Sequence, residues 1–109
     1  MSIDTSDLIQ DMLAAATGAA KGHAADLKSY LEARAKLVAD GMVELEADRV
    51  ANNITDDDVK FAFQQIKDSE MTSLLAIDVT LKAAAQDAIN AALAVASDAL
   101  NKAVGFALL

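Results

Sequence analysis

The chain has 109 residues, a formal net charge of −8, and a hydrophobic fraction of 54% with only 4% aromatic residues. This length allows one domain, and the acidic charge argues against a nucleic-acid partner, because such binding depends on clustered Lys and Arg. Cysteine is absent, which excludes disulfides, thiolate nucleophiles and Cys-ligated metals. Proline is absent as well, and alanine is abundant throughout, so the composition is typical of a helical protein.

The apolar pattern predicts an all-α protein, an antiparallel hairpin of two long helices. Helix one is expected over about residues 5–52, the turn over 52–55 and helix two over about 56–107, so that residues 1–109 form a single helical-hairpin domain. Apolar positions recur mostly every eleven residues, or about 3.67 residues per turn, in both helices. At a rise of ~1.5 Å per residue, each arm would be roughly 75 Å long.

Two glycines lie in the first predicted helix. Gly18 and Gly22 have G-x-x-x-G spacing inside a tract of small residues over 14–25. Two interpretations stay open: the glycines allow a close helix crossing, or they mark a kink or break, since each costs ~1 kcal/mol relative to Ala. In a hairpin, this tract would face the alanine-rich part of helix two, and small side chains would let the two backbones approach closely.

The turn has the clearest local signal in the chain. The asparagines at 52–53 favour leaving a helix, and Thr55 with Asp58 has the spacing of a capping box. The acidic run 56–58 suits the positive end of a helix dipole. A calcium site formed by this run and Asp48 is the alternative, but the alternating ligands, the glycine and the distal Glu of a calcium loop are missing.

Glu70 falls on the apolar seam of the second predicted helix. We expect it to form an ion pair across the hairpin with Lys36 or Arg34, which would fix the register of the two helices, or to be exposed because the seam drifts. A metal-ligand role is the weaker interpretation. The Glu-x-x-His motif of di-iron bundles is absent, and the only histidine is His23.

The last third of the chain contains an internal repeat, in which residues 86–96 align with residues 97–107. It places a row of large apolar residues beside a row of alanines, and one neighbouring helix cannot cover both rows. We therefore predict that dimerisation completes the hairpin into a four-helix bundle or a larger helical assembly. The predicted oligomer interface consists of Ile9, Leu13, Ile89, Leu93, Leu100, Val104 and Phe106.

These observations predict a structural protein that associates with itself and has no catalytic residues, cofactor or metal. An amphipathic surface-coat protein that adsorbs weakly to lipid or to a hydrophobic granule is the alternative, and a carboxylate-rich metal-binding bundle is a remote one. The acidic N-terminal segment lacks the pattern of a cleavable signal peptide, and no apolar stretch is long enough to span a membrane. A cytoplasmic location is therefore expected, although an uncleaved secretion signal would escape this test.

Overall fold

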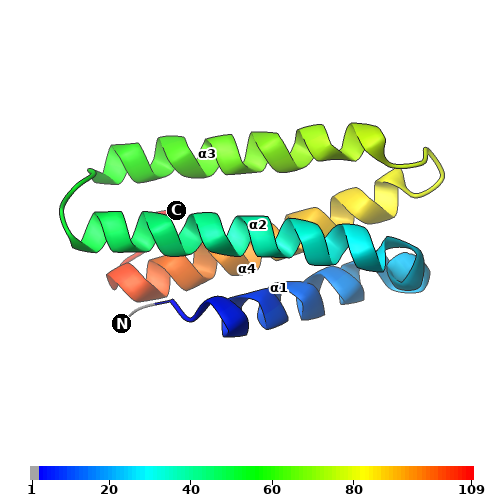
Figure 1. Cartoon of the computed structure of the whole chain (residues 1–109), viewed down its shortest axis with the longest axis horizontal. Helices are drawn as coiled ribbons and strands as arrows, with labels where there is room; N and C mark the ends of the chain where they lie inside the picture. Colours follow the sequence, from blue (N-terminus) through cyan, green and yellow to red (C-terminus); the bar gives the residue numbers. More distant parts are fainter. Residues whose placement is uncertain (1–2) are drawn as a thin grey trace.

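A computed structural model of the chain describes residues 3–109, and within them all regular structure is helical. Four α-helices follow one another, with short 3₁₀ turns after the first and the third: α1 (Thr5–Ala20), η1 (Lys21–His23), α2 (Ala24–Val50), α3 (Asp56–Ser73), η2 (Leu74–Ala76) and α4 (Lys82–Val104). Successive helices run in opposite directions along a bundle of 43 × 23 × 19 Å (Figure 1). The all-α prediction is therefore confirmed for the described residues.

The prediction of two long helices is wrong, because each is interrupted. The first break comes at η1, where Lys21 adopts a left-handed φ of 54° and the chain reverses. A Cβ atom at Gly18 or Gly22 would meet no atom within 4 Å, so neither glycine serves a close helix crossing. The break interpretation is the correct one. The glycines weaken the continuous helix, and reversal lets α1 bury its apolar face against α2 and α4.

The second break, between α3 and α4, has a different cause. After Ser73, η2 is followed by a connection in which the Asp78 carboxylate accepts hydrogen bonds from the Thr80 backbone N–H at 2.9 Å and its hydroxyl at 2.7 Å. Asp and Thr side chains compete with the helix for backbone groups, and here they form a local turn. The apolar period continues through this segment, which is why the pattern alone predicted uninterrupted helix.

The turn between α2 and α3 agrees with the prediction. Asn52 has a φ of 61°, as expected for a residue that leaves a helix. The Thr55 hydroxyl accepts a hydrogen bond from the Asp58 N–H at 3.1 Å, and the Asp58 carboxylate accepts one from the Thr55 N–H at 2.9 Å. This reciprocal pair is the capping box, and it begins α3 at the predicted residue.

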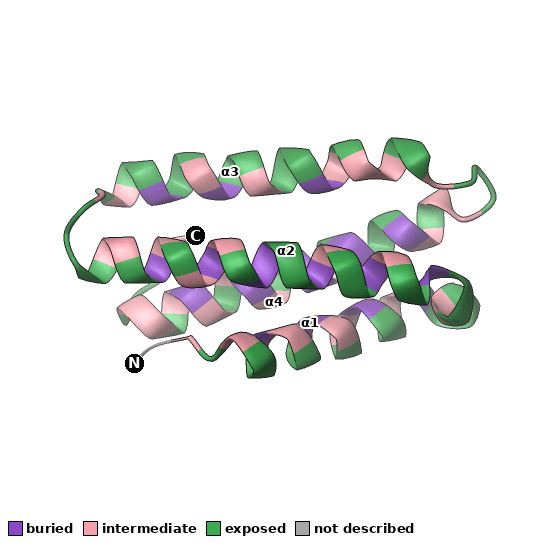
Figure 2. Ribbon diagram, in the orientation of Figure 1, coloured by how far each residue is buried: buried purple, intermediate pink, exposed green. Residues whose placement is uncertain are grey.

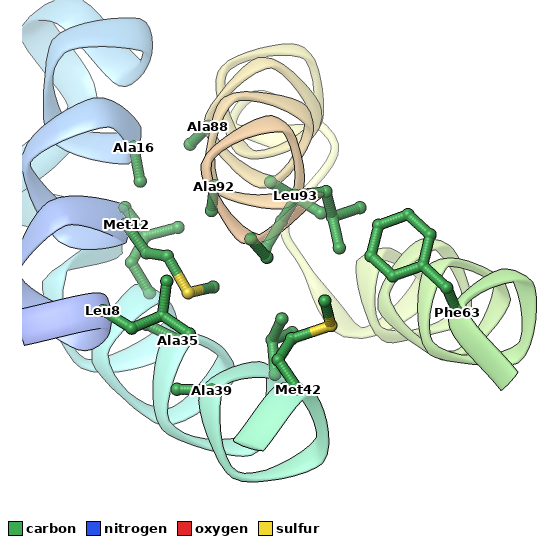
Figure 3. Packing of buried hydrophobic residues seen from close by; sticks show 14 of the residues in the cluster. Leu8, Met12, Ala16, Ala35, Ala39, Met42, Phe63, Ala88, Ala92 and Leu93 are labelled. Carbon is green, nitrogen blue, oxygen red and sulfur yellow. The ribbon is translucent and has the colours of Figure 1, made fainter. Parts of the chain in front are cut away.

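Small side chains allow α1 and α4 to pack closely. Their contact confirms that the small residues near the N-terminus face the alanine-rich helix. Ala16 lies beside Ala88 and Met12 beside Ala92 (Figure 3). The buried residues of α4 are Ala85, Ala88, Ile89, Ala92, Leu93, Ala96 and Leu100.

Helix α3 is held less deeply than the others. Only Val59, Phe63 and Glu70 are buried along its length, and most of its surface faces solvent (Figure 2). Its main partner is α2, whereas α1, α2 and α4 pack closely on one another. The α2–α3 seam is therefore where the bundle is most open.

Replacement of Ala88 by Leu should lower the free energy of unfolding by about 1–3 kcal/mol, because the larger side chain forces the close α1–α4 contact apart. Ala94→Leu is the matched control, since Ala94 is an exposed residue of the same helix and should change stability by less than about 0.5 kcal/mol. Urea unfolding measures both. Equal effects of the two substitutions would contradict the close packing of α1 on α4.

The Thr55 backbone N–H and hydroxyl lower the pKa of the Asp58 carboxyl by stabilising its charged form. Stability linked to this group is therefore present above the pKa of an unfolded Asp and is lost as pH falls through the lowered value. Thr55→Val should raise the pKa of Asp58, as followed by NMR titration. The control is Asp78, whose pKa is lowered by Thr80 and should not change. Because the variant keeps the backbone N–H bond, an unchanged Asp58 pKa would show that the Thr55 hydroxyl does not stabilise the charged carboxylate.

Candidate interaction groove

Three residues of the predicted oligomer interface lie in the core of the single chain. Ile89, Leu93 and Leu100 are buried, and Leu93 is directed toward Met42 and Phe63 in the centre of the bundle (Figure 3). The prediction assumed that one neighbouring helix would leave this row uncovered. Four short helices cover it within one chain, so these three residues are not available to a second copy in this fold.

The other predicted interface residues keep some exposure. Ile9, Leu13 and Val104 are half-buried and pack against the core, while Phe106 is exposed beyond the end of α4. Leu13 lines a shallow depression between α1 and α2, together with Thr17. These residues therefore remain candidates for contact with another molecule, but they do not line one common groove.

A groove with a volume of about 460 Å³ runs between α2 and α3. Its apolar lining comes from both helices and consists of Leu37, Val38, Gly41, Leu45, Ala62 and Ile66. Leu37 is 56% exposed although it belongs to this lining. Phe61, which is 66% exposed, precedes Ala62 and stands one helical turn before Gln65, another lining residue. Leu37 and Phe61 are thus the exposed large apolar side chains of α2 and α3 that lie in or near this groove.

The sequence analysis did not identify this groove. The predicted seam of helix one passes through Ala35, Val38, Met42 and Leu45, of which the first three are buried and Leu45 is half-buried. Leu37 and Gly41 each lie one residue before a seam position, and with Leu45 they form a second row. Such a second row at i, i+4 and i+8 was the signal available in the sequence, since these positions share one face of a helix.

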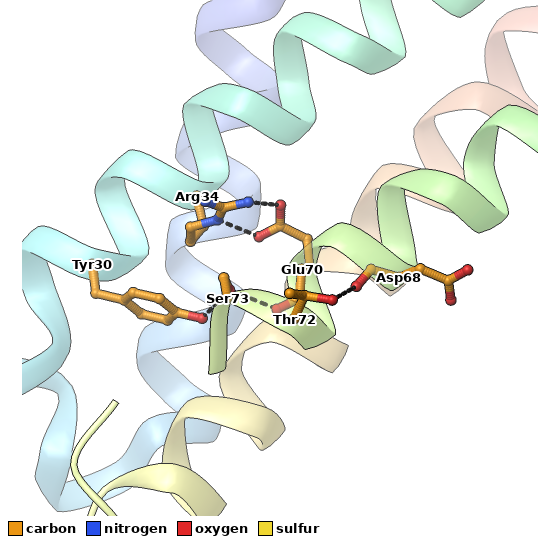
Figure 4. Close-up of polar contacts among 6 residues, drawn as sticks. All are labelled: Tyr30, Arg34, Asp68, Glu70, Thr72 and Ser73. Carbon is orange, nitrogen blue, oxygen red and sulfur yellow. Dashed lines mark hydrogen bonds and ion pairs between the residues drawn. The ribbon is translucent and has the colours of Figure 1, made fainter. Parts of the chain in front are cut away.

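An ion pair closes one end of the groove. The Arg34 guanidinium donates to Glu70 through Nε–Oε1 at 2.7 Å and Nη2–Oε2 at 2.6 Å (Figure 4). Glu70 is 3% exposed and Arg34 is 21% exposed at their side chains. The bonds to Glu70 raise the pKa of Arg34, so the guanidinium keeps its charge. The predicted ion pair of Glu70 is confirmed, with Arg34 as its partner.

The same end of α3 carries a second polar contact to α2. The Tyr30 hydroxyl and the Ser73 hydroxyl lie 2.6 Å apart, and the Ser73 hydroxyl also donates to the Glu70 carbonyl oxygen at 2.6 Å (Figure 4). Polar contacts therefore position the C-terminal half of α3, where few apolar side chains are buried.

The opposite end of the groove is acidic. Glu44 and Asp48 line it, and neither forms an ion pair within the described residues. The nearby Arg49 is bound instead to Asp56 at the start of α3. Along the groove, the neutral Arg34–Glu70 ion pair is therefore followed by two carboxylates that form no ion pair.

The carboxylates do not assemble into a metal centre: within residues 3–109, no three His, Cys, Asp or Glu side chains come together to hold an ion. In the acidic turn considered for calcium, Asp58 caps α3 and Asp56 binds Arg49. His23 is exposed in η1. The α2–α3 groove is accordingly the candidate site, because its lining includes Leu37, a large apolar side chain that is more than half exposed.

The chain matches no protein family, no curated protein and no solved structure. Among residues 3–109, none of the helices combines the length and the apolar character that crossing a membrane requires. The geometry of the groove is therefore the main support for a functional proposal.

A double-mutant cycle measures the contribution of the ion pair. Arg34→Leu should cost about 3–5 kcal/mol of unfolding free energy, because it leaves the buried Glu70 carboxylate without its partner. Adding Glu70→Leu should recover most of that loss, since no unpaired charge remains. Urea unfolding of the wild type, both single variants and the double variant gives the coupling energy. Additive losses would show that the two side chains do not stabilise each other.

Proposed function

We propose that this protein is a non-catalytic structural protein that associates with itself, and that the α2–α3 groove is its main contact surface. The observation that carries the proposal is the exposure of Leu37 in a groove whose apolar lining comes from both helices and whose two ends carry charged residues. Large apolar side chains gathered in a rimmed groove are characteristic of interaction surfaces, whereas scattered ones need no explanation.

The shape of the surface supports a helical partner. The groove lies between two antiparallel helices that are paired mainly with each other on this side of the bundle. Two such helix pairs placed face to face would form a four-helix arrangement in which the leucine of each copy is removed from water. This packing would bury Leu37 and part of Phe61 without any change in the fold.

Adsorption to a lipid surface or to a hydrophobic granule is the second candidate function. Leu75 and Val79 in the α3–α4 connection favour it, because both are more than three-quarters exposed at 77% and 79%. They lie at one end of the bundle, away from the groove (Figure 1). The net charge of −8 opposes attraction to anionic lipid, which makes this the weaker proposal.

Leu37→Glu should raise the dissociation constant of the oligomer at least about tenfold, because it places a charge in the centre of the apolar contact. Multi-angle light scattering over a concentration series measures the mass of the wild type and the variant. Leu37 is more than half exposed, so the substitution should leave the helical circular-dichroism spectrum unchanged. Leu75→Glu is the matched control, with the same chemical change outside the groove.

A wild-type protein that stays monomeric at all concentrations would overturn self-association. Loss of the oligomer in Leu75→Glu but not in Leu37→Glu would move the contact surface to the α3–α4 connection. Co-sedimentation with neutral phospholipid vesicles tests the second candidate, since binding that is lost in Leu75→Glu would support adsorption.

A further inference from the structure

The residues along the α2 side of the groove are arranged symmetrically about Gly41. Arg34 and Asp48 lie seven residues before and after it, and Leu37 and Leu45 lie four residues before and after it. All five residues line the groove. Arg34, although paired with Glu70, keeps unused N–H donors at one end, and Asp48 is a carboxylate without an ion-pair partner at the other, whereas the apolar residues at the intermediate positions are identical. Val38 and Glu44, three residues before and after Gly41, do not follow this symmetry.

This arrangement is self-complementary when a second copy of α2 is placed antiparallel to the first. In a two-fold symmetric dimer, residue i of one copy contacts residue j of the other, and j contacts i. If two α2 helices lie antiparallel with the axis near Gly41, Leu37 of each copy meets Leu45 of the other. Arg34 of each copy then meets Asp48 of the other, so that both ends of the contact pair opposite charges.

We propose that the occupant of the α2–α3 groove is a second copy of this chain, bound antiparallel about a two-fold axis that passes near Gly41. This inference rests on the proposed function and specifies its partner and orientation. A parallel arrangement would instead place Asp48 against Asp48 and Arg34 against Arg34, which costs free energy through repulsion of like charges.

Arg34 can serve both contacts. A guanidinium has five N–H donors, and the pair with Glu70 uses one on Nε and one on Nη2. Within the described residues, Nη1 makes no hydrogen bond, and the side chain is 21% exposed. The unused donors are available to the Asp48 carboxylate of a second copy. Glu44 is exposed on the same acidic end, one helical turn before Asp48.

The contact between Arg34 and Asp48 covers about half of the length of the molecule, since fourteen helical residues span ~21 Å. Two helices side by side present a face roughly 20 Å wide, because packed helices lie 8–10 Å apart. The area is then about 400 Å² per partner, below the ~800 Å² of stable specific interfaces, so we expect a weak dimer whose mass depends on concentration. A basic amphipathic helix from another protein would satisfy the acidic end alone, whereas a second copy satisfies both ends at once.

Single cysteine substitutions test the orientation, because the natural chain contains no cysteine and each variant carries one thiol. When Leu37→Cys and Leu45→Cys chains are mixed under mild oxidation, we expect a disulfide that joins one chain of each variant. Neither variant alone should form a disulfide efficiently: in the antiparallel dimer, the two copies of position 37 are eight residues apart in helix register, or ~12 Å. A disulfide requires Cα atoms within about 7 Å.

The control variant is Leu75→Cys, whose exposed thiol reports cross-linking by random collision. Rapid disulfide formation by Leu37→Cys alone would overturn the antiparallel arrangement in favour of a parallel one. Light scattering shows whether the protein is a dimer. If it is a dimer and the mixture forms disulfides no faster than the Leu75→Cys control, the second copy binds at another surface. A monomeric wild type would instead overturn the proposed function itself.

A charge substitution gives a second readout of the same proposal. Asp48→Arg should raise the dimer dissociation constant at least about tenfold, because each substituted residue would face Arg34 of the other copy. Asp40→Arg changes the net charge equally but lies on α2 outside the groove lining, so it should have little effect. Equal effects of the two variants would show that only the net charge matters, and they would contradict the proposed contact between Arg34 of one copy and Asp48 of the other.

Discussion

Side-chain volume is the constraint that shapes this bundle. Alanine supplies most of the face that α4 presents to α1, so the helices must approach closely to exclude water, and any added bulk separates them. The larger apolar residues that remain, including Met12, Met42 and Leu100, are used in the core formed by α1, α2 and α4. Little apolar volume is left to attach a fourth helix, and α3 is correspondingly shallow.

The ion pair between Arg34 and Glu70 follows from that shortage. A buried carboxylate is costly unless it is paired and hydrogen-bonded, and here both carboxylate oxygens accept from one guanidinium. The bidentate geometry holds α3 at one distance and one register along α2, in a way that a few apolar contacts would not. The groove can therefore remain open without α3 losing its position, and its open state is what the proposed self-association requires.

The sequence predicted those features that depend on short-range chemistry. Thr55 and Asp58 lie three residues apart, so their reciprocal hydrogen bonds could be recognised from spacing alone. Glu70 was recognised because a charged residue on an apolar seam needs a partner, and Arg34 was within reach in an antiparallel pair. In both cases the residue types allow few other arrangements.

The sequence left the first reversal open, since the glycines at 18 and 22 allowed either a close crossing or a break, and it did not predict the second, because the apolar period continues through it. No glycine or proline marks the connection at Asp78, and the apolar spacing there is the same in a continuous helix and in a turned one. The choice depends on tertiary burial: reversal covers Ile89 and Leu100 within one molecule, which a two-helix hairpin cannot do. Because Ile89 and Leu100 are buried within one chain, they are not available as interface residues, whereas Leu37 stays exposed and Leu45 half-buried on α2.

Gly41 connects the packing of α3 to the proposed contact between copies. A glycine inside a helix costs ~1 kcal/mol relative to Ala, yet this one lies in the middle of α2. A Cβ atom there would stand 3.3 Å from Cδ1 of Ile66, so the glycine lets that side chain rest on the α2 backbone. Ile66 consequently lies over Gly41 in the lining of the groove, at the position where two antiparallel copies would cross. One unfavourable helix residue thus shapes both the seam within the chain and the surface that the second copy is proposed to occupy.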